Sequence, residues 1–486
     1  MGVTQTNPHH ERRWVILAVI GLAQLMVVLD ATIVNVALPS AQQDLGFSDD
    51  SRQWIITAYT LAFGSLLLLG GRLGDLFGRK WAFIGGLLGF AVASAIGGAA
   101  GSFGVLAAAR AAQGAFGAVL APSALALLST TFTAPEERGK AFGIFGAIAG
   151  GGAAVGLLLG GVLTELLSWR WCLYVNLLFA IPAAVAALRL LVNQAQPDRP
   201  RPDFAGAITG TAGLFALVFG FSNSETHSWT HPVTIIALAA AVVLLVTFAL
   251  LESRVANPLL PLRVIADRTR GGAYLAVGFA AIALFGVFLF LTYYLQQTKG
   301  YSPIQTGLAF LPMPVSIVAS STTVNIKLLG RIGPRPLMTF GMCMGVIGMA
   351  WLAQIEVGSS YLTHVLPSLV VLGVGMGCVF APAFQSATFG VDVRDAGIAS
   401  AMVNVGQQVG GSIGTAMLSS IFASAVSAYV SGKVASEAVQ QQAAVHGYRV
   451  AFWVSAGIFA VGAIVVRTLM RPIAVRPPQT EVVGAD

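Results

Sequence analysis

The ten residues 71-GRLGDLFGRK-80 lie at the junction of two apolar stretches, 53–73 and 81–101. Each stretch has about twenty residues, which is the length that an α-helix needs to cross a lipid bilayer. Three glycines permit a tight turn between two helices. Arg79 and Lys80 are basic residues of the kind that stay on the cytoplasmic side of a membrane. These ten residues therefore predict a short cytoplasmic loop between two membrane-spanning helices.

The same alternation of apolar stretches and short polar breaks continues along the whole chain of 486 residues. Charged residues make up 10% of the chain and hydrophobic residues 56%, whereas a soluble domain has roughly 25% charged residues. Such a chain cannot cover a water-facing surface, which argues against a soluble enzyme, a disordered chain and a disulfide scaffold. The three cysteines form no C-x-x-C pattern, so we expect neither a disulfide framework nor a metal site.

Fourteen stretches are long and apolar enough to be membrane-spanning helices. They are predicted at 14–38, 53–73, 81–101, 103–129, 141–164, 170–191, 204–222, 232–252, 271–296, 304–328, 336–356, 362–388, 398–428 and 447–470. With a cytoplasmic N-terminus, one of the 27 Lys and Arg residues lies within a span and five lie outside the cell, which leaves 21 in the cytoplasm. This bias predicts a multi-pass protein of the cell membrane with both termini cytoplasmic.

A weak internal repeat divides the chain into two halves. The pattern G-x-V-x-A-P occurs at 117–122 and again at 377–382. Duplication of a six-helix unit explains this spacing, and chance similarity between Gly- and Ala-rich helices is the alternative. We predict an N-terminal six-helix bundle, a linker with two inserted spans, a second six-helix bundle and a cytoplasmic tail, over residues 1–191, 192–270, 271–470 and 471–486.

The stretch at 71–80 resembles the cytoplasmic loop motif of the major facilitator superfamily, Gly-x-Leu-(Ala or Gly)-Asp-x-x-Gly-Arg-(Arg or Lys). The resemblance implies that this loop acts as a cytoplasmic gate. The residues that match the motif in this role are Gly71, Asp75, Gly78, Arg79 and Lys80.

Other stretches are similar to motifs of the drug:proton antiporter family with 14 transmembrane spans. They are LDATIVNVALP at 29–39, ARAAQG at 109–114, and WRW at 169–171 followed by Asn176. The resemblance covers nearly the whole chain. It implies an all-α membrane protein with two six-helix bundles of the major facilitator type plus two additional central spans, and export driven by the inward proton gradient.

The fifth span departs from the antiporter motif of that family, which usually ends Gly-Pro-x-x-Gly-Gly. Here 156–161 read GLLLGG, so a kink at this point loses its usual cause. The glycines that allow close helix packing remain; they are Gly152, Gly156, Gly160 and Gly161.

Asp30 and Arg110 are the only charged residues that we place inside spans. Other charges, among them Glu252, fall at span ends, where they can reach water. An ionisable group within the bilayer is costly and usually functional. Burial favours a protonated acid and a nearby arginine favours the carboxylate. We therefore predict that Asp30, with Arg110, couples transport to protons; a static ion pair and direct binding of a cationic substrate by Asp30 are the alternatives.

Amides and phenols within spans are weaker candidates for lining a substrate cavity, because such side chains as often form hydrogen bonds between helices. An aromatic-rich cavity would suit an apolar or cationic ligand. The candidates are Gln24, Asn35, Tyr59, Gln113, Tyr293, Tyr294, Gln385, Asn404, Gln407 and Gln408.

Together these features predict a proton-coupled antiporter that exports small, apolar or cationic, drug-like molecules, and not an enzyme. The alternative is a dedicated exporter of a self-made antibiotic or other metabolite. No Gly-x-x-x-x-Gly-Lys-(Ser/Thr) stretch occurs, so we do not expect ATP as the driver. We expect no cofactor besides the proton as coupling ion, no metal, no nucleic-acid partner, and a monomer in the lipid bilayer with a small-molecule substrate.

Overall fold

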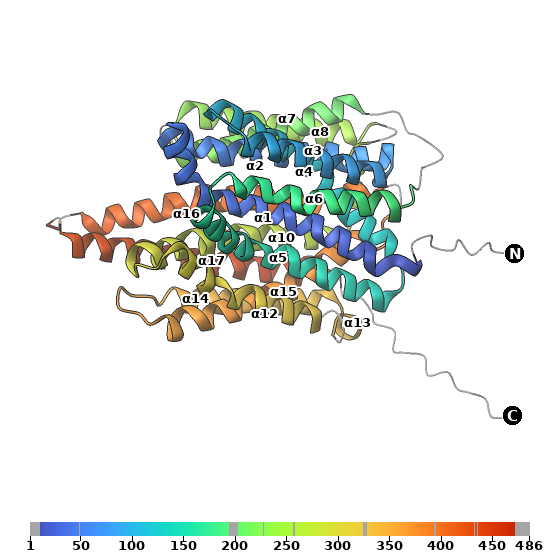
Figure 1. The fold of residues 1–486 in the computed structure, drawn as a ribbon. Helices are drawn as coiled ribbons and strands as arrows, with labels where there is room; N and C mark the ends of the chain where they lie inside the picture. The colour runs from blue at the N-terminus through green and yellow to red at the C-terminus, as the bar shows by residue number, and fades with distance from the viewer. Residues whose placement is uncertain are drawn as a thin grey trace, which may run out of the picture.

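The computed structural model describes residues 10–47, 49–193, 203–226, 228–255, 258–323, 328–392, 395–431, 433–434 and 436–471. In these ranges every regular element is a helix, and no strand occurs. Figure 1 shows long helices that run side by side along one common direction. Within the described residues, thirteen helices are long and apolar enough to cross a membrane. This confirms the predicted all-α membrane protein.

The first six long helices follow the predicted order. They are α1 (Arg13–Leu45), α2 (Asp49–Phe77), α3 (Arg79–Gly98), α4 (Phe103–Thr131), α5 (Pro135–Leu166) and α6 (Trp171–Leu190). The predicted span 141–164 lies in α5, a helix of 32 residues whose described apolar part, Val155–Leu166, is shorter than the thirteen. The helix continues past the place where the family proline is missing.

The rest of the chain begins with the inserted pair and continues into the second half. Its elements are α7 (Phe204–Thr226), α8 (Pro232–Glu252), α9 (Leu262–Ala266), α10 (Arg268–Gly286) with its π-helical continuations η2 (Val287–Leu291) and η3 (Tyr294–Thr298), α11 (Pro303–Phe310), α12 (Pro312–Thr323), α13 (Leu329–Ile332), α14 (Pro334–Leu352), η5 (Tyr361–Val365), α15 (Leu366–Thr388), α16 (Ala396–Val430) and α17 (Glu437–Leu469).

Several helices are longer than the apolar stretches that predicted them. The first span was predicted to end at 38, but α1 continues until Gly46 takes a left-handed conformation, with φ of 67°, and its N–H bonds to the Gln42 carbonyl. The last span was predicted from 447, but α17 begins after Ser436, whose side chain accepts a hydrogen bond from the Val439 N–H. Capping residues set these boundaries, and capping depends on backbone geometry rather than on hydropathy.

The turn between α2 and α3 is also shorter than predicted. Gly78 alone separates the two helices and has φ of 94°. A Cβ at this position would clash with the Asn193 side chain, which follows α6. Lys80 Nζ donates to the Leu188 carbonyl of α6 over 3.0 Å. We call the end of the molecule that holds this turn the motif end; the start of α1 and the end of α17 lie there too (Figure 1).

The two halves repeat one packing scheme. In the first half α4 packs on α2 and α3, and α1 packs on α5 and α6; in the second, α15 packs on α12 and α14, and α10 packs on α16 and α17. The halves meet where α5 packs on α12 and α15 and where α2 packs on α16. The inserted helix α7 packs on both α2 and α16, so the inserted pair lies against both halves.

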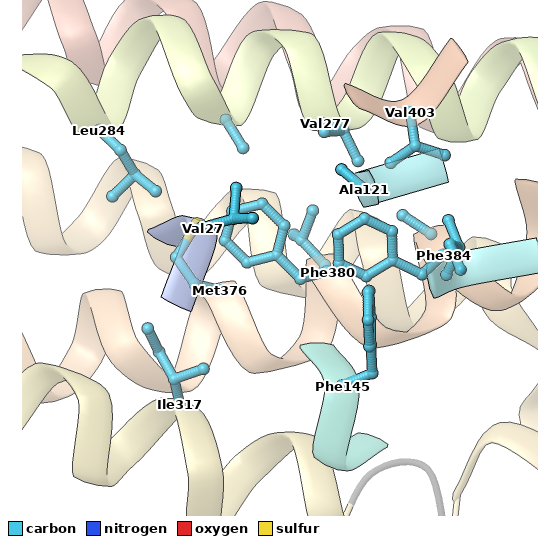
Figure 2. Close-up of a cluster of buried hydrophobic side chains, with 14 of the residues drawn as sticks. Val27, Ala121, Phe145, Val277, Leu284, Ile317, Met376, Phe380, Phe384 and Val403 are labelled. Carbon is cyan, nitrogen blue, oxygen red and sulfur yellow. The ribbon is translucent and has the colours of Figure 1, made fainter. Parts of the chain in front are cut away.

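An apolar cluster fills the space between the halves (Figure 2). Phe145 of α5 and Phe384 of α15 meet edge to face, with ring centroids 5.6 Å apart. Helices α1, α4, α10, α12 and α16 also contribute, and every labelled side chain is apolar. Because the labelled residues of this cluster carry no polar side chain, the contact between the halves here depends on apolar packing. The labelled residues are Val27, Ala121, Phe145, Val277, Leu284, Ile317, Met376, Phe380, Phe384 and Val403.

Candidate functional site

Asp30 of α1 and Arg110 of α4 form a buried ion pair inside the first half. Arg110 Nη1 and Asp30 Oδ2 are 2.5 Å apart, and the two side chains are 2% and 0% exposed. Two spans that are distant in sequence thus bring their only buried charges together. An unpaired charge in this environment would be strongly destabilising, so each residue keeps the other in place.

Two amides complete the shell around the Asp30 carboxylate. Asp30 Oδ1 accepts hydrogen bonds from Gln113 Nε2 at 2.9 Å and from Asn176 Nδ2 of α6 at 2.7 Å. Arg110 Nη1 also donates to Gln113 Oε1 at 2.9 Å. Asp30, Arg110 and Gln113 therefore form a closed ring of contacts. Three donors thus satisfy the oxygens of one buried carboxylate.

Ser94 of α3 and Tyr59 of α2 extend this network. Ser94 Oγ accepts from Gln113 Nε2 at 2.7 Å and from Asn176 Nδ2 at 3.3 Å. The Arg110 guanidinium lies over the Tyr59 ring, 4.4 Å from its centroid, in the geometry of a cation–π contact. Sequence reasoning proposed Tyr59 and Gln113 as cavity residues, noted Asn176 only as part of a motif, and missed Ser94. A lone serine in an apolar span carries no signal that distinguishes it from a packing residue.

The network leaves two polar atoms without a hydrogen-bond partner, Arg110 Nε and Asn176 Oδ1. Each buried polar atom that lacks a partner costs about 1–3 kcal/mol. The arrangement is therefore less stable than its number of hydrogen bonds suggests.

A row of glycines on α5 packs directly against the turn of α1 that carries Asp30. A Cβ on Gly156 would clash with Thr32 Oγ1 and would stand 3.1 Å from the Leu29 carbonyl oxygen. A Cβ on Gly152 would meet Val28 at 2.9 Å, and one on Gly160 would meet the Ile33 carbonyl at 2.9 Å; Gly161 is buried as well. The glycines of the antiporter motif therefore let α5 approach the backbone around Asp30 closely.

Most of the remaining cavity candidates lie in the second half. Tyr294 donates its hydroxyl hydrogen to the Glu356 carbonyl at 2.8 Å, and Asn404 Nδ2 bonds to the Ser400 carbonyl of its own helix at 3.1 Å. Helical spacing does not reveal which face of a span meets a partner, so these residues stay predictions as cavity residues. Of the others, Gln24 is buried, Tyr293 is exposed, and Gln385, Gln407 and Gln408 are half-buried.

Gly71 of the loop motif lies where α2 meets the second half. A Cβ on Gly71 would stand 2.9 Å from the Gly397 carbonyl of α16, so this glycine permits a close approach between the halves. Arg79 and Lys80 begin α3 and are half-buried. Asp75 of the motif and the cavity candidate Asn35 lie outside the residues whose side chains the structure describes.

A helical membrane protein with two packed halves and a buried ion pair in one of them has the architecture of a secondary transporter. The model of the Major Facilitator Superfamily matches residues 20–415. The chain belongs to this superfamily and is a membrane transporter rather than an enzyme.

Similarity to individual proteins extends over most of the chain. It is 50% identical to the puromycin resistance protein pur8 of Streptomyces alboniger, over 94% of this chain and 92% of that protein. It is 40% identical to the cephamycin export protein CmcT of Amycolatopsis lactamdurans, over 83% and 84%. The crystal structure of the human organic anion transporter MFSD10 (TETRAN) matches with a TM-score of 0.64 and 15% identity, over 94% of this chain and 99% of that chain. This last match shows a shared fold.

Proposed function

We propose that this protein is an antiporter of the cell membrane that exports a small antibiotic-like molecule in exchange for protons, with both termini in the cytoplasm. The buried Asp30–Arg110 pair is the observation that carries the proton part of the proposal. Two relatives whose names refer to resistance to, or export of, an antibiotic support the substrate class. In this proposal the motif end faces the cytoplasm, in keeping with the positive-inside rule.

Proton binding would change the forces that hold α1 against α4. A proton on Asp30 removes the negative charge that Arg110 balances, so the ion pair loses its Coulombic attraction. Arg110 would then keep Gln113 and the Tyr59 ring as partners. Because α5 packs closely on the same turn of α1 and also meets α12 and α15, a shift of α1 would reach the interface between the halves.

The structure favours proton coupling over direct substrate binding by Asp30. In the described conformation Asp30 is fully buried among α1, α3, α4 and α6, with three donors on its carboxylate. The apolar cluster between the halves suits an apolar or amphipathic substrate better than a strongly polar one. A dedicated exporter is the second form of the proposal, and the names of the two relatives, each of which refers to one antibiotic, favour it.

The coupling role is tested with Asp30→Asn in proteoliposomes. Accumulation of puromycin driven by a proton gradient should fall at least tenfold, while exchange of puromycin without a gradient should continue. The matched control is Asp44→Asn, because Asp44 also lies on α1 and also pairs with an arginine, Arg170, at 2.9 Å, but on the surface. Undiminished gradient-driven accumulation in Asp30→Asn would refute the coupling role, and loss of both activities would favour a static pair.

Substrate breadth needs a separate experiment in a host that lacks its own efflux pumps. Puromycin, a cephamycin and unrelated cations such as ethidium would be scored for resistance with and without a protonophore. Resistance to one chemical class would support a dedicated exporter, and resistance to several would support a broad pump. Efflux that persists under the protonophore would exclude the proton gradient as the driver.

A further inference from the structure

A second buried acid lies at the motif end of the inserted pair. Glu252 is the last residue of α8, where the sequence predicted access to water, yet it is only 4% exposed. Its Oε2 accepts a hydrogen bond from the Leu260 N–H at 2.8 Å, because the chain after α8 folds back over the helix end. Its Oε1 is buried and has no hydrogen-bond partner. The expected exposure of this residue is therefore wrong.

Asp203, which precedes α7, faces Glu252. Asp203 Oδ1 accepts from the Gly206 N–H at 2.9 Å, while Oδ2 is buried without a partner. A Cβ on Gly206 would clash with both Asp203 Oδ2 and Glu252 Oε1, so these two oxygens occupy one small space. The two side chains are close enough for a hydrogen bond between carboxyl groups. Oxygens of ionised carboxylates can only accept hydrogen bonds, so one of the two carboxyl groups must be protonated for a hydrogen bond to form between them.

The surrounding charges also favour a single shared proton. The charged groups that face Glu252 are Asp203 and Arg72, the second residue of the loop motif. Arg72 lies on α2 and is buried. Two ionised carboxylates at this distance repel each other strongly. With one proton, the acid pair has a single negative charge, which the positive charge of Arg72 attracts.

Helix ends indicate which acid holds the proton. Asp203 stands at the N-terminal end of α7, where the helix dipole favours a negative charge, and Glu252 stands at the C-terminal end of α8, where the dipole opposes one. The proton therefore belongs on Glu252 Oε1, which donates to Asp203 Oδ2.

We propose that Asp203 and Glu252 form a second proton-binding site, which holds one shared proton at neutral pH and fastens the α7–α8 pair beside Arg72 of α2. This site is separate from Asp30. Loss of the shared proton would place two like charges between the ends of α7 and α8. Because α7 packs on both α2 and α16, the protonation state of this site acts where the two halves meet.

The site is tested by infrared spectroscopy of the purified full-length protein. The wild type should show the carbonyl band of a protonated carboxylic acid at pH 7, and Glu252→Gln should lack it. Glu356→Gln, which alters an exposed glutamate at the opposite end, and Asp30→Asn should both keep the band. An unchanged band in Glu252→Gln would overturn the proposal, and so would a wild type without the band whose binding of Mg²⁺ or Ca²⁺ is lost in Glu252→Gln.

Thermal unfolding provides an independent measurement. A folded state that holds a proton which the unfolded chain has lost becomes less stable as the pH rises, so the Tm of the wild type should fall from about pH 4.3, the ordinary pKa of a glutamate, up to about pH 7. Glu252→Gln should remove this part of the decrease, because glutamine keeps the hydrogen bonds without titrating. A pH dependence that is identical in the wild type and in Glu252→Gln would overturn the proposal.

Discussion

The two six-helix halves share their packing but differ in polarity. Gly117 of α4 and Gly377 of α15, which correspond in the repeat, both lie at close helix crossings. A Cβ on Gly117 would stand 2.9 Å from the Phe63 ring of α2, and one on Gly377 would stand 2.7 Å from the Ser321 nitrogen of α12. Each helix also has an internal proline five residues later, Pro122 and Pro382. The scaffold is thus repeated in detail.

Among the residues of the second half that the structure describes, the polar network has no counterpart. At the spacing of the repeat, Asp30 corresponds to the region of Phe288 and Arg110 to that of Val370. Phe288 stacks on Phe310, with ring centroids 5.9 Å apart. A group that exists only to support the fold would be expected in both copies. Its place in one half supports the coupling role proposed for Asp30.

The largest effect is expected when the ion pair loses only its cation. Arg110→Met leaves the Asp30 carboxylate buried without its cation, and such a change costs about 3–5 kcal/mol. The double variant Asp30→Asn/Arg110→Met removes the uncompensated charge and should recover most of the stability but no gradient-driven transport. Thermal unfolding in detergent and proteoliposome efflux measure the two properties. If the single and double variants were equally stable, the pair would not be energetically coupled.

A charge introduced into the second half tests whether that half accepts a buried charge as the first half does. Leu369, a neighbour of Val370 in α15, is 0% exposed. Leu369→Arg buries a cation in the half that has no counterpart of Asp30, which should cost about 2.5–3.5 kcal/mol and lower the yield of folded protein. Leu369→Met is the control and should cost less than about 1.5 kcal/mol. A fully stable Leu369→Arg variant would show that the second half accepts charge as readily as the first.

The shared packing predicts similar penalties at equivalent glycines. Gly117→Ala and Gly377→Ala each force a methyl group into a close helix crossing, at about 1–3 kcal/mol each. The penalty at Gly377 should be the larger, because it meets the Ser321 and Ile317 backbone whereas the Phe63 ring can rotate. Gly457→Ala, with nothing within 4 Å of the added Cβ, is the control. Thermal unfolding measures these penalties, and an unchanged Tm in either variant would contradict the equivalence of the two helix crossings.

The smallest effect is expected for the Tyr59 ring, over which the Arg110 guanidinium lies. Tyr59→Leu removes the ring that faces the guanidinium and should destabilise the protein by about 0.5–2 kcal/mol. Tyr59→Phe keeps the ring and should unfold within a degree or two of the wild type. Equal losses in both variants would show that the hydroxyl group, and not the ring, supports Arg110.

The positions of Asp30 and Arg110 could be predicted from sequence because a charge within an apolar stretch stands out against its neighbours. Gln113 and Tyr59 were candidates because polar side chains also stand out within apolar spans. They belonged to a larger set, most of whose other members lie in the second half. Ser94 could not be found, because its role depends on the face that α3 presents to α4 and α6. Glu252 was misjudged, because the chain that covers it comes from residues beyond the helix end.

The sequence by itself determined the membrane-spanning helices, the family and the two buried charges, since hydropathy, motif spacing and isolated charges are local properties of the chain. Only the tertiary structure decided which polar groups complete the Asp30 shell, how closely the α5 glycines approach α1, and that Asp203 and Glu252 share one enclosed space. The reason is physical: hydrogen bonds, close packing and burial depend on where segments distant in sequence meet, and neighbouring residues along the chain do not record those distances.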